Sequence, residues 1–505
     1  MRDFRHLMFA MCSVIVVIGR CAAADATSEK PIPIGLHKQL FVDDYVISEK
    51  QNVVRTLGKV SKANGGKPVL TADRPWETDN ILIGSVFREG NTFKMYYKVG
   101  YSKPEPNDPP GTTQLRVAYA ESTDGLHWTK PNLGIRTFEG NKENNLVHPL
   151  GMTCLPDPNE TDPEHKYKAA YSHWQQMKAA IAHSADGINW TPYNGGSPVT
   201  PRAADTVNQI VWDPQAKTYR LYTRTDYQQE LRAKIEVRGT RDMTNPHVKA
   251  DPTAWKTVRE WALQEREPEE YKRRQIYSLN GWFYEGVHFG LLWSYEWPGD
   301  LSEGPHDLHA RHERDIMNFF LLTTRNDEPW NLEWVYANKP LIPRGPDGAF
   351  DKDWIQPAIN IVTADDKHWI YYSGAQERHD IKGSRPVAIG LATLRLDGFA
   401  ALEANGQRGS VVTKPFRLDD DTLEVNADAT AGRLLVDVLD AVGQPIEGFT
   451  AKMCRSITTD DLRHKVAWKS EKQLASLVGQ TIRLRFHLEG PAKLYSFQVL
   501  SGSEN

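Results

Sequence analysis

Four carboxylate side chains, Asp79, Asp205, Glu285 and Asp353, occupy positions from which this chain could carry out acid–base chemistry. Asp79, Asp205 and Asp353 lie near the entries of predicted strands, about eight residues before the strand ends. Glu285 precedes Gly286 in a segment that matches a predicted turn at residues 88–90, so a structural role is its alternative. Paired carboxyl groups can act as general acid and as base or nucleophile when their surroundings separate their pKa values.

Other polar and aromatic side chains are expected near these acids. The same count along the predicted strands selects His148, Gln275 and Gln356. Tryptophans 76, 174, 282 and 354 could stack on a ligand or pack between strands. Four cations could hold a carboxylate, sulfate or phosphate group, or could pair with neighbouring acids. They are Arg202, Arg224, Arg378 and His379.

An internal repeat indicates the elements that must position these residues. Residues 122–128 (STDGLHW) and 184–190 (SADGINW) share the pattern S-x-D-G-x-x-W. Degenerate copies follow at residues 240–242, 324–330 and 396–399. Each Asp-Gly pair is typical of a tight turn between strands. The sequence therefore predicts five copies of one strand–turn–strand unit.

Aromatic runs precede the turns and predict the strands of each unit. They lie at residues 93–97, 167–171, 219–223, 288–293 and 369–373. Short runs of aromatic and branched residues favour strands. Each unit then forms a four-stranded meander, and five meanders predict an all-β fold in which residues 35–405 form a five-bladed β-propeller.

The pattern changes beyond the last turn. Residues 409–500 alternate polar and apolar side chains in short segments, which predicts a C-terminal, jelly-roll-like β-sandwich. Residues 300–314 show no periodicity and are expected to form a solvated loop, although three histidines there leave a metal site as the alternative. These histidines are His306, His309 and His312. We otherwise expect no metal site.

The N-terminal segment predicts export. Residues 1–24 combine a basic start, a 13-residue apolar run and Ala22–Ala24, as in a cleaved signal peptide. A lipid anchor at Cys21 is the alternative, which Arg20 disfavours. We expect a secreted or periplasmic protein without a membrane partner after cleavage. Cys154 and Cys454 would then remain, either as separate thiols or as a disulfide.

The composition narrows the function classes. The chain has 505 residues, 40% hydrophobic and 25% charged residues, and a formal net charge of −4. These values are typical of a globular protein with a large core. The near balance of charge and the lack of a basic block make nucleic acid an unexpected partner.

These repeats resemble the five-bladed propeller glycosidases, the superfamily of invertases, arabinanases and β-xylosidases. Residues 40–45 (LFVDDY), 396–399 (LDGF) and 494–497 (LYSF) are also similar to signatures of exported bacterial proteins grouped with the invertase-type N-terminal domain. The resemblance covers residues 35–500. It implies a carbohydrate substrate and the roles of nucleophile or base for Asp79 and of orienting acid for Asp205.

The chain departs from those families in its acids. It lacks the W-M-N-D-P-N, R-D-P, E-C and E-G-P motifs, so the general acid stays open, with Glu285, Glu269 and Glu270 as alternatives. The resemblance implies an exported glycoside hydrolase. A non-catalytic carbohydrate-binding propeller, or a phosphorylase or lyase on the same scaffold, is the alternative. We expect no cofactor, and a calcium ion in the channel and the oligomeric state stay open.

Overall fold

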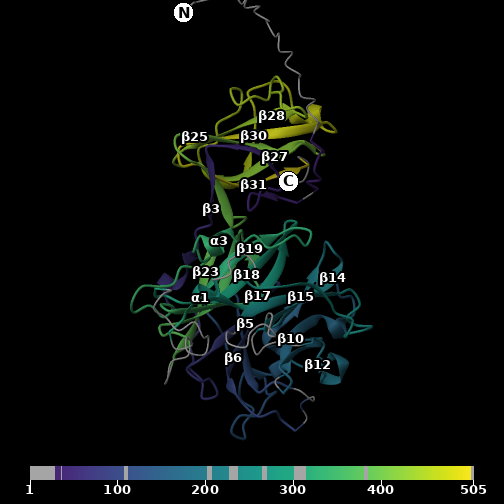
Figure 1. Ribbon diagram of the computed structural model, residues 1–505, viewed down its shortest axis with the longest axis vertical. Coiled ribbons are helices and arrows are strands. Elements are labelled where there is room, and N and C mark those ends of the chain that lie inside the picture. The colour runs from purple at the N-terminus through teal and green to yellow at the C-terminus, as the bar shows by residue number, and fades with distance from the viewer. Residues whose placement is uncertain are drawn as a thin grey trace, which may run out of the picture.

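A computed structural model describes residues 29–501 except 36, 107, 109–111, 174, 202–206, 227–236, 264–269, 301–313 and 380–384. Within these residues the α-helices are α1 (Glu270–Arg273) and α3 (Glu333–Tyr336), and almost all other regular structure is strand. The predicted all-β class is confirmed. Figure 1 shows two lobes along the long axis, with the C-terminal strands in the upper one.

Three antiparallel sheets follow one another in the larger lobe, each a meander of four strands in chain order. In each, the aromatic run of the sequence forms the second strand. The first sheet contains β5 (Leu82–Glu89), β6 (Thr92–Tyr101), β7 (Leu115–Ser122) and β8 (Leu146–Val147). The second contains β9 (Leu155–Pro156), β10 (Tyr167–His173), β11 (Lys178–Ser184) and β12 (Thr191–Pro192). The third contains β13 (Gln209–Asp213), β14 (Thr218–Asp226), β15 (Arg238–Asn245) and β16 (Lys256–Trp261).

An eight-stranded sheet completes this lobe and consists of two abutting meanders. The first contains β17 (Arg274–Tyr284), β18 (Val287–Glu296) and β19 (Ile316–Thr324). The second contains β20 (Trp354–Pro357), β21 (Val362–Ala364), β22 (Lys367–Ala375), β23 (Val387–Arg395) and β4 (Ser61–Lys62). The parallel pair Met317–Trp354 joins the two meanders. The early strand β4 supplies the outer edge of the last one.

The S-x-D-G turns have the same hydrogen bonds in both complete copies. Ser122 Oγ accepts from Gly125 N at 2.9 Å, and Asp124 Oδ1 accepts from His127 N at 2.8 Å. Ser184 and Asp186 repeat these contacts with distances of 2.9 and 2.8 Å. Gly125 and Gly187 have φ of 72° and 79°, a region that favours glycine. The motif is therefore a structural turn.

An amide side chain ties the sheets together at the centre of the lobe. Gln209 is fully buried and donates from Nε2 to the carbonyl oxygens of Gly281 and Ile359 at 2.9 and 2.8 Å. Its Oε1 accepts from Gly281 N at 2.7 Å. Ile359 N in turn donates to Gly84 O at 2.9 Å. Gln209 thus joins β13 to two segments of the eight-stranded sheet, and Ile359 joins them to β5. These bonds satisfy buried backbone groups that would otherwise lack partners.

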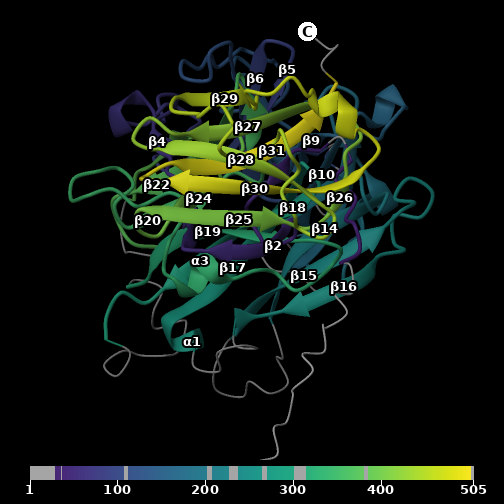
Figure 2. The ribbon, with the colours of Figure 1, turned by 90° about the horizontal axis from the view of Figure 1, so that it is seen from above.

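Two further sheets pack around a second core in the C-terminal lobe. Phe41, Phe486 and Phe497 are buried there with ring centroids 5.6–5.9 Å apart. One sheet contains β29 (Asp460–Lys465), β27 (Thr422–Asp428), β31 (Lys493–Leu500), β24 (Ala400–Ala404), β3 (Val53–Leu57) and β1 (Gln39–Leu40). The other contains β2 (Ile47–Gln51), β25 (Arg408–Thr413), β30 (Thr481–Glu489), β26 (Phe416–Arg417) and β28 (Arg433–Asp440). In Figure 2, β25, β30 and β28 run side by side.

The N-terminal strands pair with this C-terminal lobe. β1 pairs with β31, β2 with β25 and β3 with β24. The sequence pattern predicts one propeller over residues 35–405, which places residues 35–57 with the repeats that follow them. Strand pairing instead groups β1 to β3 with strands more than 340 residues later, because Phe41 belongs to the second core.

Some sequence predictions concern residues that the structure does not describe. The predicted signal at residues 1–24 and the three histidines between 301 and 313 fall there. Cys154 and Cys454 are described, buried and not disulfide-bonded. In the part of the chain with described positions, no helix is long and apolar enough to cross a membrane.

Candidate functional site

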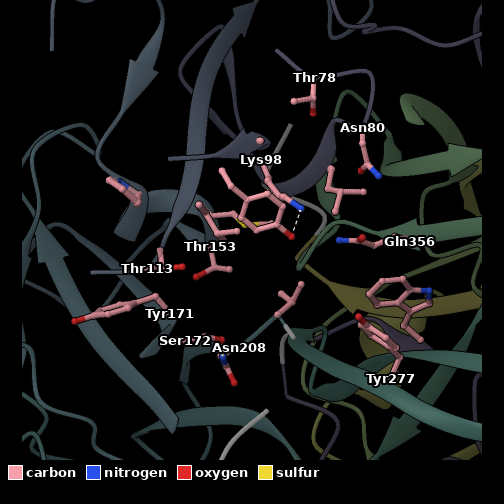
Figure 3. A pocket seen from close by; sticks show the side chains of 18 of the residues that line it. Thr78, Asn80, Lys98, Thr113, Thr153, Tyr171, Ser172, Asn208, Tyr277 and Gln356 are labelled. Carbon is pink, nitrogen blue, oxygen red and sulfur yellow. Dashed lines mark hydrogen bonds between the residues drawn. The ribbon is translucent and has the colours of Figure 1, made fainter. Parts of the chain in front are cut away.

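A cavity of about 510 Å³ opens where strands of the larger lobe converge (Figure 3). Its walls come from all the sheets of that lobe. They include Asn80 and Leu82 near β5, Lys98 and Tyr101 on β6, Tyr171 and Ser172 on β10, Val207 and Asn208 before β13, Tyr277 on β17, and Trp354 and Gln356 on β20. This volume is typical of a small-ligand site.

One wall of the cavity is aromatic. Tyr277, Trp293 and Trp354 line it, with the Tyr277 and Trp293 centroids 4.2 Å apart and the two indoles edge-on at 5.5 Å. Trp293 and Trp354 are almost fully buried, so their positions are fixed by packing. Flat apolar faces beside polar groups suit the apolar faces of sugar rings.

Basic side chains also line the cavity. They are Lys98, His379 and Arg385. Tyr295 Oη lies 3.1 Å from His379 Nε2, and the Arg385 guanidinium lies 4.8 Å from the Trp354 ring centroid. None of the described residues that line the cavity is an aspartate or a glutamate. The described walls therefore carry positive charge and no carboxylate.

Asn80 and Gln356 supply amide groups to the cavity wall. Gln356 Nε2 donates to Ile83 O at 3.1 Å. Among the described residues, neither Gln356 Oε1 nor Asn80 Oδ1 has a hydrogen-bond partner. Gln356 was one of the predicted binding residues, and the structure places it in the cavity. Both amide oxygens could accept a hydrogen bond from a bound ligand.

Asp79 is exposed but does not line the cavity. The lining residues of this segment are Thr78, Asn80 and Leu82. Side chains alternate along an extended chain, so Asp79 lies on the other side from them. The backbone carbonyl of Asp79 accepts from Val387 N at 2.7 Å. The sequence pattern selected a segment that borders the cavity, but Asp79 is the neighbour of the lining residue Asn80.

Asp353 lies beside the cavity, one residue before Trp354, in a cluster of cations. Its carboxylate oxygens are 3.4 Å from Arg344 Nη1, 3.7 Å from Lys352 Nζ and 3.6 Å from Arg378 Nε. Arg378 also donates to Arg314 O at 3.0 Å. The structure thus brings the predicted Asp353 and Arg378 together as an ion pair, and neither lines the cavity.

His148 and Gln275 occupy structural positions. His148 Nε2 lies 3.3 Å from Asp108 Oδ1, and its Nδ1 accepts from Leu150 N at 3.4 Å. Burial lowers the pKa of His148. The next residue, Pro149, lines the cavity although His148 does not. Gln275 is fully buried and accepts from Arg238 N at 2.8 Å.

Glu285 lies in the turn between β17 and β18, with φ of 46°. Its Oε2 accepts from Lys38 N at 2.9 Å. Tyr277, which lines the cavity, is eight residues earlier on β17. Eight residues of strand span about 26 Å. The structure therefore places Glu285 far from the cavity, in the turn that was its alternative role.

Trp76 and Arg224 are packed rather than presented to the cavity. Trp76 Nε1 donates to Asn145 Oδ1 at 2.7 Å, and its ring lies edge-on to Phe138 at 6.3 Å. Arg224 is buried, with its guanidinium 5.5 Å from the Tyr277 ring centroid. Arg224 thus lies behind the aromatic wall, against Tyr277. His379 and Trp354 are the other predicted residues that reach the cavity.

Arg202, Asp205, Glu269 and Trp174 lie outside the described residues. The residues that follow Asp205 closely in the chain, Val207 and Asn208, line the cavity. Asn208 Nδ2 donates to Ser172 Oγ at 3.0 Å on the same wall. Glu270 is described and forms an ion pair with Arg274 at 2.8 Å.

Lys98, Asn80, Tyr277 and Arg385 were not predicted as site residues. A sequence signal for Lys98 existed, because it follows the aromatic run 93–97 within a strand whose other residues are mostly apolar. A lysine there is unusual unless its ammonium has a partner or a ligand. Asn80 and Arg385 carry no comparable signal.

No protein-family model matches this chain, and no curated relative matches it. Solved structures do. A glycosyl hydrolase from Bacteroides ovatus has 14% identity over 70% of this chain and 96% of its own, with a TM-score of 0.39. The α-L-arabinofuranosidase from Podospora anserina, in complex with cellotriose, has 10% identity over 67% and 96%, with a TM-score of 0.39. The fructofuranosidase from Schwanniomyces occidentalis has 9% identity over 88% and 100%, with a TM-score of 0.34.

These matches combine 9–14% identity with TM-scores of 0.34–0.39. TM-scores of this size are too low to assign an activity to the chain.

Proposed function

We propose that this chain is an exported glycoside hydrolase that binds a saccharide in the cavity and cleaves a glycosidic bond there. The main support for this proposal is the cavity, which is lined by an aromatic wall and by amide and hydroxyl groups. Saccharide sites combine apolar ring contacts with a few oriented polar groups. Export follows from the composition of residues 1–24.

The scaffold in this proposal is a five-bladed propeller with a C-terminal β-sandwich. Three four-stranded sheets supply three blades, and the eight-stranded sheet supplies two, because a single parallel pair joins its halves. The two sheets around Phe41 supply the sandwich, together with β1 to β3. A ring of blades would bring the first strand of each meander to the axis, where the cavity lies.

Asp205 is the acid we assign to the reaction. The assignment rests on the sequence prediction and on Val207 and Asn208, two and three residues later in the chain, which line the cavity. Glycoside hydrolysis needs a second carboxyl group about 5–10 Å from the first. Asp353, which directly precedes the lining residue Trp354, is our candidate for it. Its ion pairs with Arg344 and Arg378 hold the carboxylate in place, which suits an orienting role.

A non-catalytic saccharide-binding function is the second candidate. The observation that favours it is the lack of a carboxyl group among the described residues that line the cavity. Such a protein would bind the same ligands without turnover.

A polysaccharide panel distinguishes the two candidates. Release of reducing ends by the wild type, reduced at least 1000-fold by Asp205→Asn with unchanged melting temperature, supports hydrolysis. Glu285→Gln is the matched control, because its carboxylate lies in a distant turn. Saccharide binding without cleavage by the wild type would support the second candidate.

A further inference from the structure

The ammonium group of Lys98 is buried in the cavity wall without a carboxylate partner. Lys98 is 9% exposed and lines the cavity from β6. Its Nζ donates to Tyr101 Oη at 2.8 Å and lies 4.0 Å from the centre of that ring. No ion pair of Lys98 occurs among the residues with described positions. A hydroxyl and an aromatic ring solvate an ammonium but do not neutralise it.

Two other buried lysines of the larger lobe, in contrast, form ion pairs with carboxylates. Lys168 has a 3% exposed side chain and lies 2.5 Å from Asp157 and 3.1 Å from Glu160. Lys130, with a 4% exposed side chain, lies 2.7 Å from both Asp73 and Glu77. Each is held by two carboxylates, as expected for buried charges. Lys98 differs from both, because it has no ion pair among the described residues and it lines the cavity of about 510 Å³.

We propose that the cavity accepts a saccharide that carries an oxyanion, a carboxylate or a sulfate, and that Lys98 binds this group. The inference rests on the proposed saccharide-binding function and names its substrate class. The ligand would supply the negative charge that the described cavity wall lacks. Arg385 adds positive charge to the same cavity, and His379 adds an imidazole.

A free anion fits these observations less well than an anionic sugar. The cavity of about 510 Å³ is much larger than one phosphate ion needs, and its aromatic wall offers nothing to such an ion. A sugar ring can contact Trp354 while its substituent reaches the ammonium. Leu82 pairs with Lys98, and Gln356 binds the carbonyl oxygen of Ile83, so Lys98 and the Gln356 amide occupy adjoining parts of one wall (Figure 3).

The test compares matched ligands by calorimetry on the full chain. The probes are uronic acid oligosaccharides with their carboxyl-reduced counterparts, sulfated galactan oligosaccharides with their desulfated counterparts, and sodium phosphate. We expect the wild type to bind one anionic sugar on the order of 10- to 100-fold more tightly than its neutral counterpart. Which pair shows the preference distinguishes carboxylate from sulfate. The preference should weaken as salt rises.

The variants are Lys98→Met, which removes the charge but keeps most of the stem, and Lys98→Arg, which keeps the charge. Lys98→Met should abolish the preference and Lys98→Arg should retain part of it. Lys94→Met is the control, because Lys94 lies on the same strand, does not line the cavity and pairs with Glu89 at 2.5 Å. It should leave the preference unchanged.

The melting temperature provides a second measurement, which distinguishes a ligand-binding role of Lys98 from a structural one. Removing an unpaired buried charge relieves a desolvation cost, so Lys98→Met should keep or raise the melting temperature. Lys168→Met leaves two carboxylates without their cation, so it should lower the melting temperature. A fall for Lys98→Met comparable to that for Lys168→Met would overturn the inference.

The outcomes also separate this inference from the proposed function. If neutral sugars bind as tightly as anionic ones to both wild type and Lys98→Met, the inference is wrong and saccharide binding stands. If only phosphate binding depends on Lys98, the anionic sugar is likewise excluded. If no saccharide of either kind binds, the proposed function fails together with the inference.

Discussion

Ser496 Oγ donates a hydrogen bond to Asp397 Oδ2 at 2.9 Å and thereby joins the two lobes. Asp397 is 1% exposed, and its other carboxylate oxygen accepts from Tyr284 Oη at 2.6 Å and Lys38 Nζ at 3.2 Å. Two of the three short signatures in the sequence, LDGF and LYSF, therefore meet at this carboxylate. The third, LFVDDY, begins next to it, since Gln39 pairs with Phe497.

Asp397→Asn should destabilise the protein more than Ser496→Ala. The aspartate change leaves the Lys38 ammonium without its carboxylate and weakens several buried hydrogen bonds, which costs about 3 kcal/mol of unfolding free energy. Ser496→Ala removes one hydrogen bond, at about 1 kcal/mol. Urea unfolding measures both. Equal, small losses would show that the carboxylate does not organise the junction.

The buried His368 should make stability fall in mild acid. Burial lowers its pKa from 6.5 to about 4, against the opposing effect of Asp397. Its Nε2 accepts from Asp397 N at 3.1 Å, which requires the neutral ring. Because the unfolded state takes up the proton first, stability is complete above pH 6.5 and is lost as pH falls from 6.5 toward 4.

Urea unfolding at pH 7.5 and 5 tests this. The wild type should lose about 2 kcal/mol from this histidine over that range. His368→Gln, which keeps an acceptor for Asp397 N, should show a smaller loss. Burial also lowers the pKa of His288. His368→Gln should therefore retain part of the pH dependence of the unfolding free energy. Identical slopes in both proteins would refute the assignment.

Two glycines with positive φ provide a matched test of the turn packing. A Cβ at Gly187, in the second S-x-D-G turn, would lie 2.5 Å from the hydroxyl of the buried Tyr96. A Cβ at Gly195 would meet nothing within 4 Å. Gly195→Ala should cost about 1 kcal/mol for its backbone, and Gly187→Ala about 3 kcal/mol because a clash is added. Thermal unfolding measures both, and equal costs would contradict the packing.

The turn motifs, the aromatic strands and the all-β class were predictable because they depend on local sequence. The S-x-D-G hydrogen bonds close within five residues. The place of β1 to β3 was not predictable, since the pairing of Gln39 with Phe497 depends on the packing of Phe41 between distant strands. Periodicity does not encode that choice.

The candidate site was predicted to within one residue in one place and missed in another. A register shift between Ile83 and Ser85 alters the alternation of this strand. A count made back from Phe87 therefore selects Asp79 in place of Asn80. Lys98 was not predicted, because the catalytic hypothesis concerned carboxylates and Lys98 has no carboxylate partner among the described residues.

Neighbouring substitutions test which side of this segment faces the ligand. Asp79→Asn should change saccharide affinity and turnover by less than about twofold, because Asp79 does not line the cavity. Asn80→Ala should weaken affinity about tenfold by removing a polar group from the wall. Titration with the saccharide selected by the panel measures both. The reverse order would return Asp79 to the site.

The central claim is that the saccharide binds in the cavity between the aromatic wall and Lys98. A crystal structure of the full chain with the selected oligosaccharide tests it most directly. We predict electron density for a sugar ring in contact with Tyr277 and Trp354, with its anionic group within 3.2 Å of Lys98 Nζ, a typical hydrogen-bond distance. A saccharide bound elsewhere, such as the groove formed by Arg408, Arg485 and His487 on the C-terminal lobe, with the cavity empty, would contradict the account.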